Sequence, residues 1–118
     1  MPEGRNTENG RYSMAVRHID FEEYKNEILK SDKLVLIDFF ATWCGPCKML
    51  SPVIEQIAEE HTEIEVVKVD VDKVPELAVS YNVVSIPTLV FLKDGNLVKQ
   101  SVGFSSKAEI EKMIEECR

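Results

Sequence analysis

Two cysteines separated by two residues are the most chemically distinctive feature of this chain. Cys44 and Cys47 follow an apolar segment, residues 34–40, and begin a segment with helical periodicity. Residues three apart on a helix face the same side, with Cβ atoms about 5–6 Å apart. A disulfide joins Cα atoms about 4.4–6.8 Å apart. The pair can therefore form and break a disulfide with little backbone movement, as reversible dithiol–disulfide chemistry requires.

The start of the predicted helix favours a thiolate at Cys44. Its free N–H groups and its dipole stabilise negative charge, and Lys48 adds positive charge one turn later. We therefore expect Cys44 to be the exposed nucleophile and Cys47, inside the first turn, to be the resolving thiol. Trp43 is expected to lie beside the pair as an apolar lid. Pro46 suits a first helical turn, where its missing N–H is not needed.

A zinc half-site and a pair of inert buried thiols are the other interpretations of this pattern. Structural zinc usually takes four ligands, often from two such cysteine pairs. The remaining candidate ligands, Cys117, His18 and His61, have no paired spacing. Cys117 falls on the apolar face of the last predicted helix, and both histidines are expected at the surface. The pattern therefore favours redox chemistry, and no metal site is predicted.

Length, charge and composition restrict the function further. A chain of 118 residues suits one domain, and its net charge of −7 with no basic cluster argues against nucleic acid or an anionic membrane as partner. No apolar stretch approaches the roughly 20 residues that cross a bilayer. Residues 1–13 are polar, so we expect a disordered N-terminal extension or leader there and one domain over residues 14–118. The absence of a secretion signal favours the cytoplasm, where thiols stay reduced.

The order of the predicted elements indicates an α/β protein. Apolar and alternating segments predict five strands, at about residues 15–19, 34–37, 64–71, 88–93 and 96–102. Capping residues and periodicity predict helices after Asp20, Cys44, Asp72 and Ser106. Strands joined through a helix are expected to be parallel, and the last two to form a hairpin. These elements predict a central mixed, mostly five-stranded β-sheet with about four helices on its two faces.

The helix after the cysteines is expected to bury one apolar face, made of Met49, Leu50, Val53, Ile54, Ile57 and Ala58. Before the cysteines, Asp38 interrupts an apolar strand, and alternation places it on the same face as Leu36 and Phe40. Desolvation there would raise the pKa of Asp38, and such an acid near Cys47 can accept and return the thiol proton. The alternative is an exposed carboxylate at the end of a strand.

Several of these segments together resemble the thioredoxin family. Residues 43–48, Trp-Cys-Gly-Pro-Cys-Lys, are similar to the active-site motif of that family. Residues 38–41 precede the motif as they do there, although Phe40 stands where Trp is frequent. Residues 68–70, residues 85–88 and Gly103 also have family-like spacing. The resemblance covers about residues 15 to 117 and implies the thioredoxin fold.

The resemblance also implies a set of functional residues. The catalytic residues would be Cys44, Cys47 and Asp38. The residues that support the site would be Trp43, Gly45, Pro46, Lys48 and Lys68. The residues that bind substrate would be Trp43, Ser85, Ile86, Pro87 and Gly103. A cis Ile86–Pro87 bond would lie against the cysteine pair, and an extended substrate segment would pair with the Ile86 backbone.

The implied activity is reduction of protein disulfides through a reversible Cys44–Cys47 disulfide, with no bound cofactor. Electrons would come indirectly from NADPH through thioredoxin reductase, a separate flavin enzyme, because this chain has no Gly-rich dinucleotide motif. Disulfide-containing proteins would be the substrates, and a monomer would suffice. A disulfide oxidase or isomerase is one alternative, but such relatives typically carry His where this chain has Pro46. A non-catalytic binding module is another, and retention of both cysteines, Asp38 and Pro87 argues against it.

Overall fold

The central strand β2 (Val35–Phe40) is buried along its whole length in the computed structural model, which describes residues 16–118. Its side chains are large and apolar on both faces, apart from Asp38, as in a strand covered by helices on both sides. It pairs in parallel with β3 (Glu65–Asp70) and antiparallel with β4 (Thr88–Lys93). The predicted buried strand is therefore confirmed, and it extends to Phe40.

Two further strands complete a five-stranded mixed sheet of order β1-β3-β2-β4-β5. The short β1 (Arg17–His18) runs parallel to β3, and β5 (Asn96–Val102) runs antiparallel to β4. The turn between β4 and β5 has positive φ at Asp94 and Gly95, as the predicted hairpin requires. The N-terminal extension or leader predicted for residues 1–13 lies outside the described residues.

The connection from β3 to β4 does not follow the expectation of parallel strands. Since β3 is parallel to β2 and β4 is antiparallel to it, β3 and β4 run in opposite directions. The helix between them, α3 (Pro75–Ser80), has six residues and is about 9 Å long. A strand of six residues spans about 20 Å, so α3 is too short to carry the chain back across the sheet. The chain therefore enters β4 at the same end of the sheet at which it left β3.

Three helices begin at the predicted capping residues, whereas α3 begins after Val74 and not after Asp72. Asp20 and Glu23 cap α1 (Phe21–Glu23) reciprocally, with N···O distances of 2.9 and 2.8 Å. The helix continues as a π-helical segment, η1 (Tyr24–Ile28), in which the Leu29 N–H donates to the Tyr24 carbonyl. Ser106 and Glu109 form the same capping box at α4 (Lys107–Cys117). Both predicted capping boxes are confirmed.

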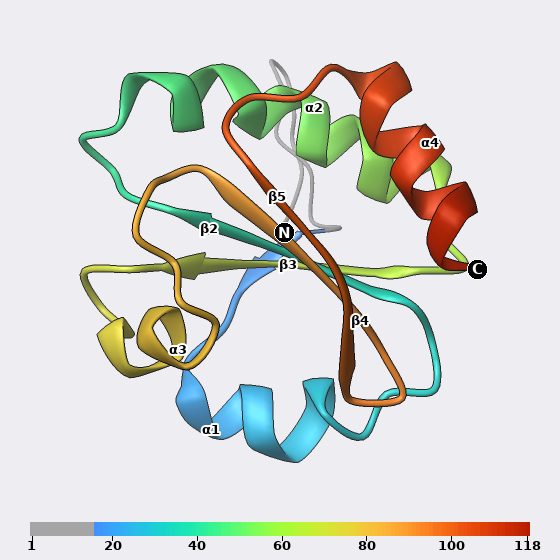
Figure 1. Cartoon of the computed structure of the whole chain (residues 1–118), viewed down its shortest axis with the longest axis horizontal. Coiled ribbons are helices and arrows are strands. Elements are labelled where there is room, and N and C mark those ends of the chain that lie inside the picture. The colour runs from blue at the N-terminus through green and yellow to red at the C-terminus, as the bar shows by residue number, and fades with distance from the viewer. Residues whose placement is uncertain (1–15) are drawn as a thin grey trace, which may run out of the picture.

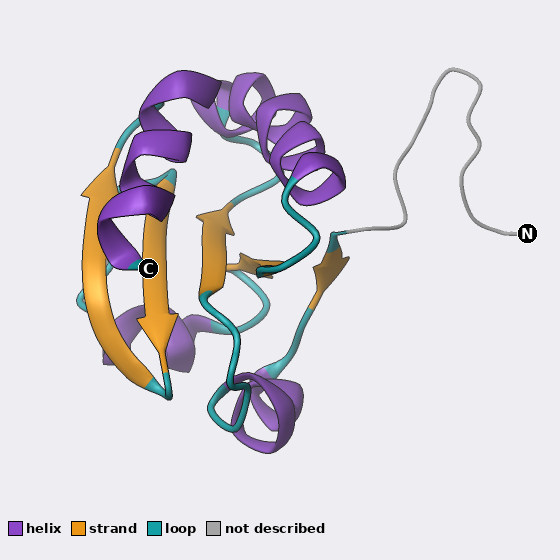
Figure 2. Ribbon diagram, turned by 90° about the vertical axis from the view of Figure 1, so that its right-hand side faces the viewer, coloured by secondary structure: helices purple, strands orange, loops and turns teal. Residues whose placement is uncertain are grey.

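Helices cover both faces of the sheet, as predicted. The long helix α2 (Gly45–Glu60) and α4 lie on one face, and α1 and α3 lie on the other (Figures 1 and 2). Each layer has its own apolar core. Beneath α2 and α4 the core includes Leu36, Leu50, Ile54, Leu89, Phe91 and Ile110. Beneath α1 and α3 it includes Ile28, Ile37, Phe39, Val67, Leu77 and Val90.

One residue of the expected apolar face of α2 lies elsewhere. Met49 is 66% exposed, whereas Leu50, Ile54, Ile57 and Ala58 are buried and Val53 is partly buried. The buried residues follow steps of three and four, and Met49 falls one position, about 100°, away from that stripe.

Among residues 16–118, no helix is long and apolar enough to cross a membrane.

Candidate active site

Cys44 and Cys47 lie at the N-terminus of α2 and are joined by a disulfide. Cys44 is the N-cap residue with an extended backbone, and its Sγ accepts a hydrogen bond from the Cys47 N–H at 3.2 Å. The two Cα atoms are 5.3 Å apart. This is the geometry expected of a pair that can open and close without large backbone movement.

The expectation that Cys44 is exposed is wrong for this disulfide form. Cys44 is 5% exposed and Cys47 is 4% exposed, because both pack in a small cluster with Phe40 and Ala41, against Ile86. Their surroundings differ even so. The Cys44 Sγ lies 3.9 Å from the carbonyl oxygen of Ile86, whereas Cys47 lines a cavity that Cys44 does not line. The two sulfurs therefore have different neighbours, although their exposures are similar.

The indole of Trp43, which was expected to lie beside the cysteine pair as an apolar lid, is an exposed surface. The residue is 69% exposed, and its Nε1–H donates to Asp72 Oδ2 at 2.8 Å. Asp72 lies two residues after the end of β3, at the same end of the sheet where β2 leads into the cysteine pair. The sequence analysis used Asp72 only as the start of a helix. Its position after a strand parallel to β2 is the signal that would have placed it near Trp43.

Two small or rigid residues separate the cysteines. Pro46 occupies the first turn of α2, as predicted, and both Gly45 and Pro46 are exposed. A Cβ added at Gly45 would have no atom within 4 Å. The fold therefore does not need glycine at this position for space, and the surface beside Cys44 stays open.

The segment from Ser85 to Pro87 lies beside Cys44, and its Ile86–Pro87 bond is cis, as predicted. Ser85 is exposed, Ile86 is partly buried and Pro87 is buried. The N–H of Gly103 donates to the Pro87 carbonyl at 2.8 Å. Gly103 has a φ of +94°, a backbone angle that residues other than glycine rarely adopt. The structure thus brings all the predicted substrate-binding residues to one end of the sheet, where α2 begins with the two cysteines.

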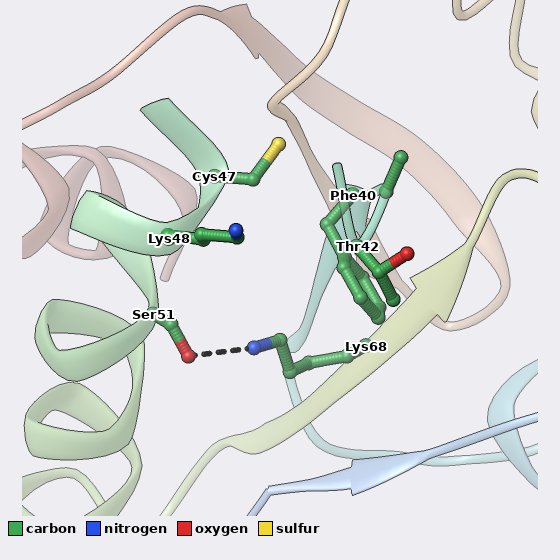
Figure 3. Close-up of a pocket in the computed structure, with 7 residues that line it drawn as sticks. Phe40, Thr42, Cys47, Lys48, Ser51 and Lys68 are labelled. Atoms are coloured by element: carbon green, nitrogen blue, oxygen red, sulfur yellow. Dashed lines mark hydrogen bonds between the residues drawn. The ribbon is translucent and has the colours of Figure 1, made fainter. Parts of the chain in front are cut away.

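A cavity of about 190 Å³ opens beside Cys47, large enough for several water molecules. Its lining residues come from the end of β2, the loop after it, the first turns of α2, and β3: Phe40, Ala41, Thr42, Cys47, Lys48, Ser51 and Lys68 (Figure 3). Lys68 is 6% exposed, and its Nζ donates to Ser51 Oγ at 2.8 Å. The same Nζ lies 4.9 Å from the centre of the Phe40 ring. Ser51 was not singled out in the sequence.

Asp38 is fully buried, so the alternative of an exposed carboxylate is wrong. Neither of its carboxyl oxygens has a hydrogen-bond partner among the described residues. Burial raises the pKa of Asp38 to about 6, and the nearby charge of Lys68 lowers it in part. Asp38 and Lys68 are register partners on the adjacent strands β2 and β3. The expected desolvated acid is therefore present beneath the cysteine helix.

The remaining cysteine and the histidines lie away from the pair. Cys117 is partly buried in α4, and burial raises the pKa of its thiol. His18 stands edge-on to the Phe40 ring, and burial together with Lys68 lowers its pKa. His61 is partly buried and pairs with Glu111. Within residues 16–118, no group of three or more His, Cys, Asp or Glu side chains is placed to hold a metal ion.

Comparisons with known proteins agree with this site. The family model Thioredoxin matches residues 15–116. A protein named thioredoxin from Mycobacterium bovis is 53% identical over 88 residues, which is 74% of this chain and 76% of that protein. A protein from Mycobacterium leprae named bifunctional thioredoxin reductase/thioredoxin is 51% identical over 85 residues, 71% of this chain and 19% of its own length.

A solved structure is also similar. It comes from a study of thiol resolution in yeast mitochondrial 1-Cys peroxiredoxin by glutathione and thioredoxin systems. The match has a TM-score of 0.77 and 34% identity, and it covers 86% of this chain and 93% of the other.

A cysteine pair that caps a helix on such a sheet defines a thiol–disulfide oxidoreductase. The comparisons make the class more specific. The chain belongs to the thioredoxin family, and its activity is that of a protein-disulfide reductase. This family uses a redox-active disulfide in place of a bound cofactor and works with thioredoxin reductase.

Proposed function

We propose that Cys44 is the attacking sulfur and Cys47 the resolving sulfur in the reduction of protein disulfides. The Cys44 thiolate attacks one sulfur of the substrate disulfide, forming a mixed disulfide and releasing the other sulfur as a thiolate. The Cys47 thiolate then attacks Cys44 Sγ, closing the Cys44–Cys47 disulfide and releasing the second substrate sulfur. Two electrons pass from the protein dithiol to the substrate.

The observation that carries this assignment is the N-cap position of Cys44. Its Sγ accepts the Cys47 N–H, and a thiolate there faces the positive end of the α2 dipole. The neighbouring surface is open, since Trp43, Gly45 and Pro46 are all exposed. Cys47 instead lines the cavity whose wall includes the buried Lys68. A substrate approaching from solvent would therefore meet Cys44 first.

Asp38 is proposed to accept the proton of Cys47 before the resolving attack and to pass it afterwards to the departing substrate thiolate. A carboxyl group with pKa of about 6 is ionised for the most part at neutral pH and still holds protons readily. It shares the α2-facing side of β2 with Phe40, which lines the cavity beside Cys47. Lys68 is proposed to support this exchange through its charge.

The substrate segment is proposed to lie along residues 84–87. The Ile86 carbonyl already lies near Cys44 Sγ, and its backbone would pair with an extended substrate chain as an added strand. Ser85, Pro87 and Gly103 would shape this surface. Exposed apolar side chains around it, Trp43, Val84, Val102 and Phe104, would contact the substrate.

The oxidised protein is proposed to be re-reduced by a separate thioredoxin reductase, a flavin enzyme driven by NADPH. The fused reductase and thioredoxin of Mycobacterium leprae support this partnership. We further propose a cytoplasmic monomer formed by residues 14–118, with disulfide-containing proteins as substrates and neither nucleic acid nor membranes as partners. The net charge of −7 supports the last point.

Two cysteine variants test the proposed roles. Cys44→Ser should lose turnover of insulin disulfides completely, whereas Cys47→Ser should retain the nucleophile and accumulate mixed disulfides. Non-reducing electrophoresis and intact mass measure the trapped species. If Cys44→Ser trapped the covalent complexes and Cys47→Ser did not, the roles would be reversed. If the wild-type protein left insulin intact while its disulfide cycled with dithiothreitol, a binding module would be the better description.

A further inference from the structure

Lys68 is held in place by two contacts that the cysteine chemistry does not use directly. A buried ammonium group is costly unless it is hydrogen-bonded or paired. Here Nζ donates to Ser51 Oγ at 2.8 Å and lies 4.9 Å from the centre of the Phe40 ring. Figure 3 shows the Lys68 and Ser51 side chains meeting at one end of the cavity, with Phe40 beside them. The ammonium therefore has a hydroxyl and an aromatic face as partners.

One strand partner of Lys68, the buried Asp38, makes no hydrogen bond to it. Asp38 is opposite Lys68 in the β2–β3 register, yet neither Asp38 oxygen has a hydrogen-bond partner among the described residues. A lysine released from Ser51 would have an unpartnered buried carboxyl group on the adjacent strand. A close ion pair between the two would favour the ionised acid strongly and hinder its protonation.

We propose that Ser51 is a positioning residue, whose hydroxyl, with the Phe40 ring, holds the Lys68 ammonium on the cavity side and thereby keeps Asp38 free to exchange protons. This inference rests on the proton-transfer role proposed above for Asp38. Ser51 touches neither substrate nor the reacting sulfurs in this scheme. It acts through Lys68, by deciding which of two buried partners the ammonium contacts.

Other charged groups lie on the elements around this site. Lys48 and Glu55 are on α2, His18 is on β1 and Asp70 is on β3. β4 presents the apolar Leu89 opposite Asp38. Lys68 also lowers the pKa of His18, so the His18 imidazole reports independently on any movement of the Lys68 charge. Asp70 accepts a hydrogen bond from the Asp72 N–H at 2.9 Å, so one of its carboxylate oxygens already has a partner.

The test compares Ser51→Ala with Ser51→Thr in the oxidised protein. Alanine is the better helix former, and threonine keeps a hydroxyl. The ¹³C carboxyl resonance of Asp38, assigned by its absence in Asp38→Asn, is titrated from pH 3 to 9, and the His18 imidazole is followed in the same samples. Ser51→Ala should lower the Asp38 midpoint by about one pH unit, and Ser51→Thr should restore it. An unchanged or raised Asp38 midpoint in Ser51→Ala would overturn the proposal.

A matched control and a kinetic arm separate this inference from the proposed function. Ser80→Ala, which removes a hydroxyl bonded to the Leu77 carbonyl in α3, should leave the Asp38 midpoint unchanged. The titration involves no turnover, so it tests the placement of Lys68 alone. If the midpoint moves as expected but Asp38→Asn resolves mixed disulfides at the wild-type rate, Ser51 positions Lys68 and the catalytic role of Asp38 is wrong.

Discussion

The two faces of β2 differ in the residues that they present and in their roles. Towards α1 and α3 the strand presents Ile37 and Phe39, which belong to a core without any buried charged side chain among the described residues. Towards α2 it presents Leu36, Asp38 and Phe40, and the buried charged residues of β3 lie on this side as well. The apolar face stabilises the fold, whereas the α2 face places a desolvated acid beneath the cysteine helix. Function and stability are thus separated by the alternation of one strand.

The largest effect is expected on the apolar face. Ile37→Ala removes fully buried methyl groups from the core beneath α1 and α3 and should lower the free energy of unfolding by about 2–5 kcal/mol. Because no ionisable group is lost, the decrease should be the same at pH 5 and pH 8. Denaturant melts at the two pH values measure it. A decrease that varied with pH would show that the two faces are not independent.

On the α2 face, Asp38→Asn should stabilise the oxidised protein at high pH. The folded pKa of about 6 lies above the ordinary value of 3.8 because of burial. The folded state therefore binds the proton more tightly, and wild-type stability falls as pH rises from about 4 through 6. Asparagine removes this loss, which amounts to about 3 kcal/mol at pH 8, since each tenfold change in proton affinity is ~1.4 kcal/mol.

Denaturant melts of the wild type and Asp38→Asn at pH 3.5 and 8 check this expectation. The gain should be present at pH 8 and absent at pH 3.5. Asp94→Asn makes the same chemical change in the exposed hairpin turn, where asparagine tolerates the positive φ, and it sets the baseline for removing a surface carboxylate. Equal gains for Asp38→Asn at both pH values would contradict a buried acid that loses stability on ionisation.

A substitution in the first turn of α2 should alter the dithiol–disulfide equilibrium of the cysteine pair and leave the buried Asp38 in place. Pro46→His puts an imidazole between the cysteines, where it favours the thiolate and hence the reduced form. The protein should become more oxidising by tens of millivolts, with tenfold in the equilibrium constant for each ~30 mV. Equilibration with glutathione measures this change, and Pro46→Asn is the uncharged control. An unchanged equilibrium in Pro46→His would mean that Pro46 does not set the reducing character.

The smallest effect is expected at Gly45. A Cβ there meets no atom of this chain within 4 Å, so Gly45→Ala should change stability by less than about 0.5 kcal/mol. If protein substrates pass over this surface, reduction of insulin should slow by several fold, and reduction of a small aromatic disulfide should not. Equal rates for wild type and Gly45→Ala with both substrates would show that the substrate chain does not approach Gly45.

Much of the fold could be predicted because its signals are local. Alternation marks the buried strand and places Asp38 on the α2 side, and the capping residues Asp20 and Ser106 mark where helices begin. The direction of β4 was predicted wrongly because it depends on the length of α3, which sets whether the chain can cross the sheet. The π-helical turn at Tyr24 has no local signal, and its tyrosine hydroxyl contacts Tyr81 from a distant element at 2.6 Å.

The site was predictable where residues are close in sequence and less so where they meet across the fold. The spacing of Cys44 and Cys47 is enough to predict that the two residues can form a disulfide. The contact of Lys68 with Ser51 joins β3 to α2, 17 positions away, and depends on side-chain placement that no periodicity encodes. The burial of Cys44 was also missed, because Ile86 and Phe40, from separate segments, pack around it.

The central claim is that the buried acid on the α2 face serves the resolving sulfur. Single-turnover stopped-flow of the reduced protein with a peptide disulfide separates the attack by Cys44 from the resolution by Cys47. In the wild type, the resolving rate should rise as pH passes through the pKa of Asp38, which is about 6 in the disulfide form. In Asp38→Asn this rise should disappear and the resolving rate should fall by about 100-fold at pH 7, with the attack rate nearly unchanged. Equal resolving rates and pH profiles in the two proteins would contradict the claim.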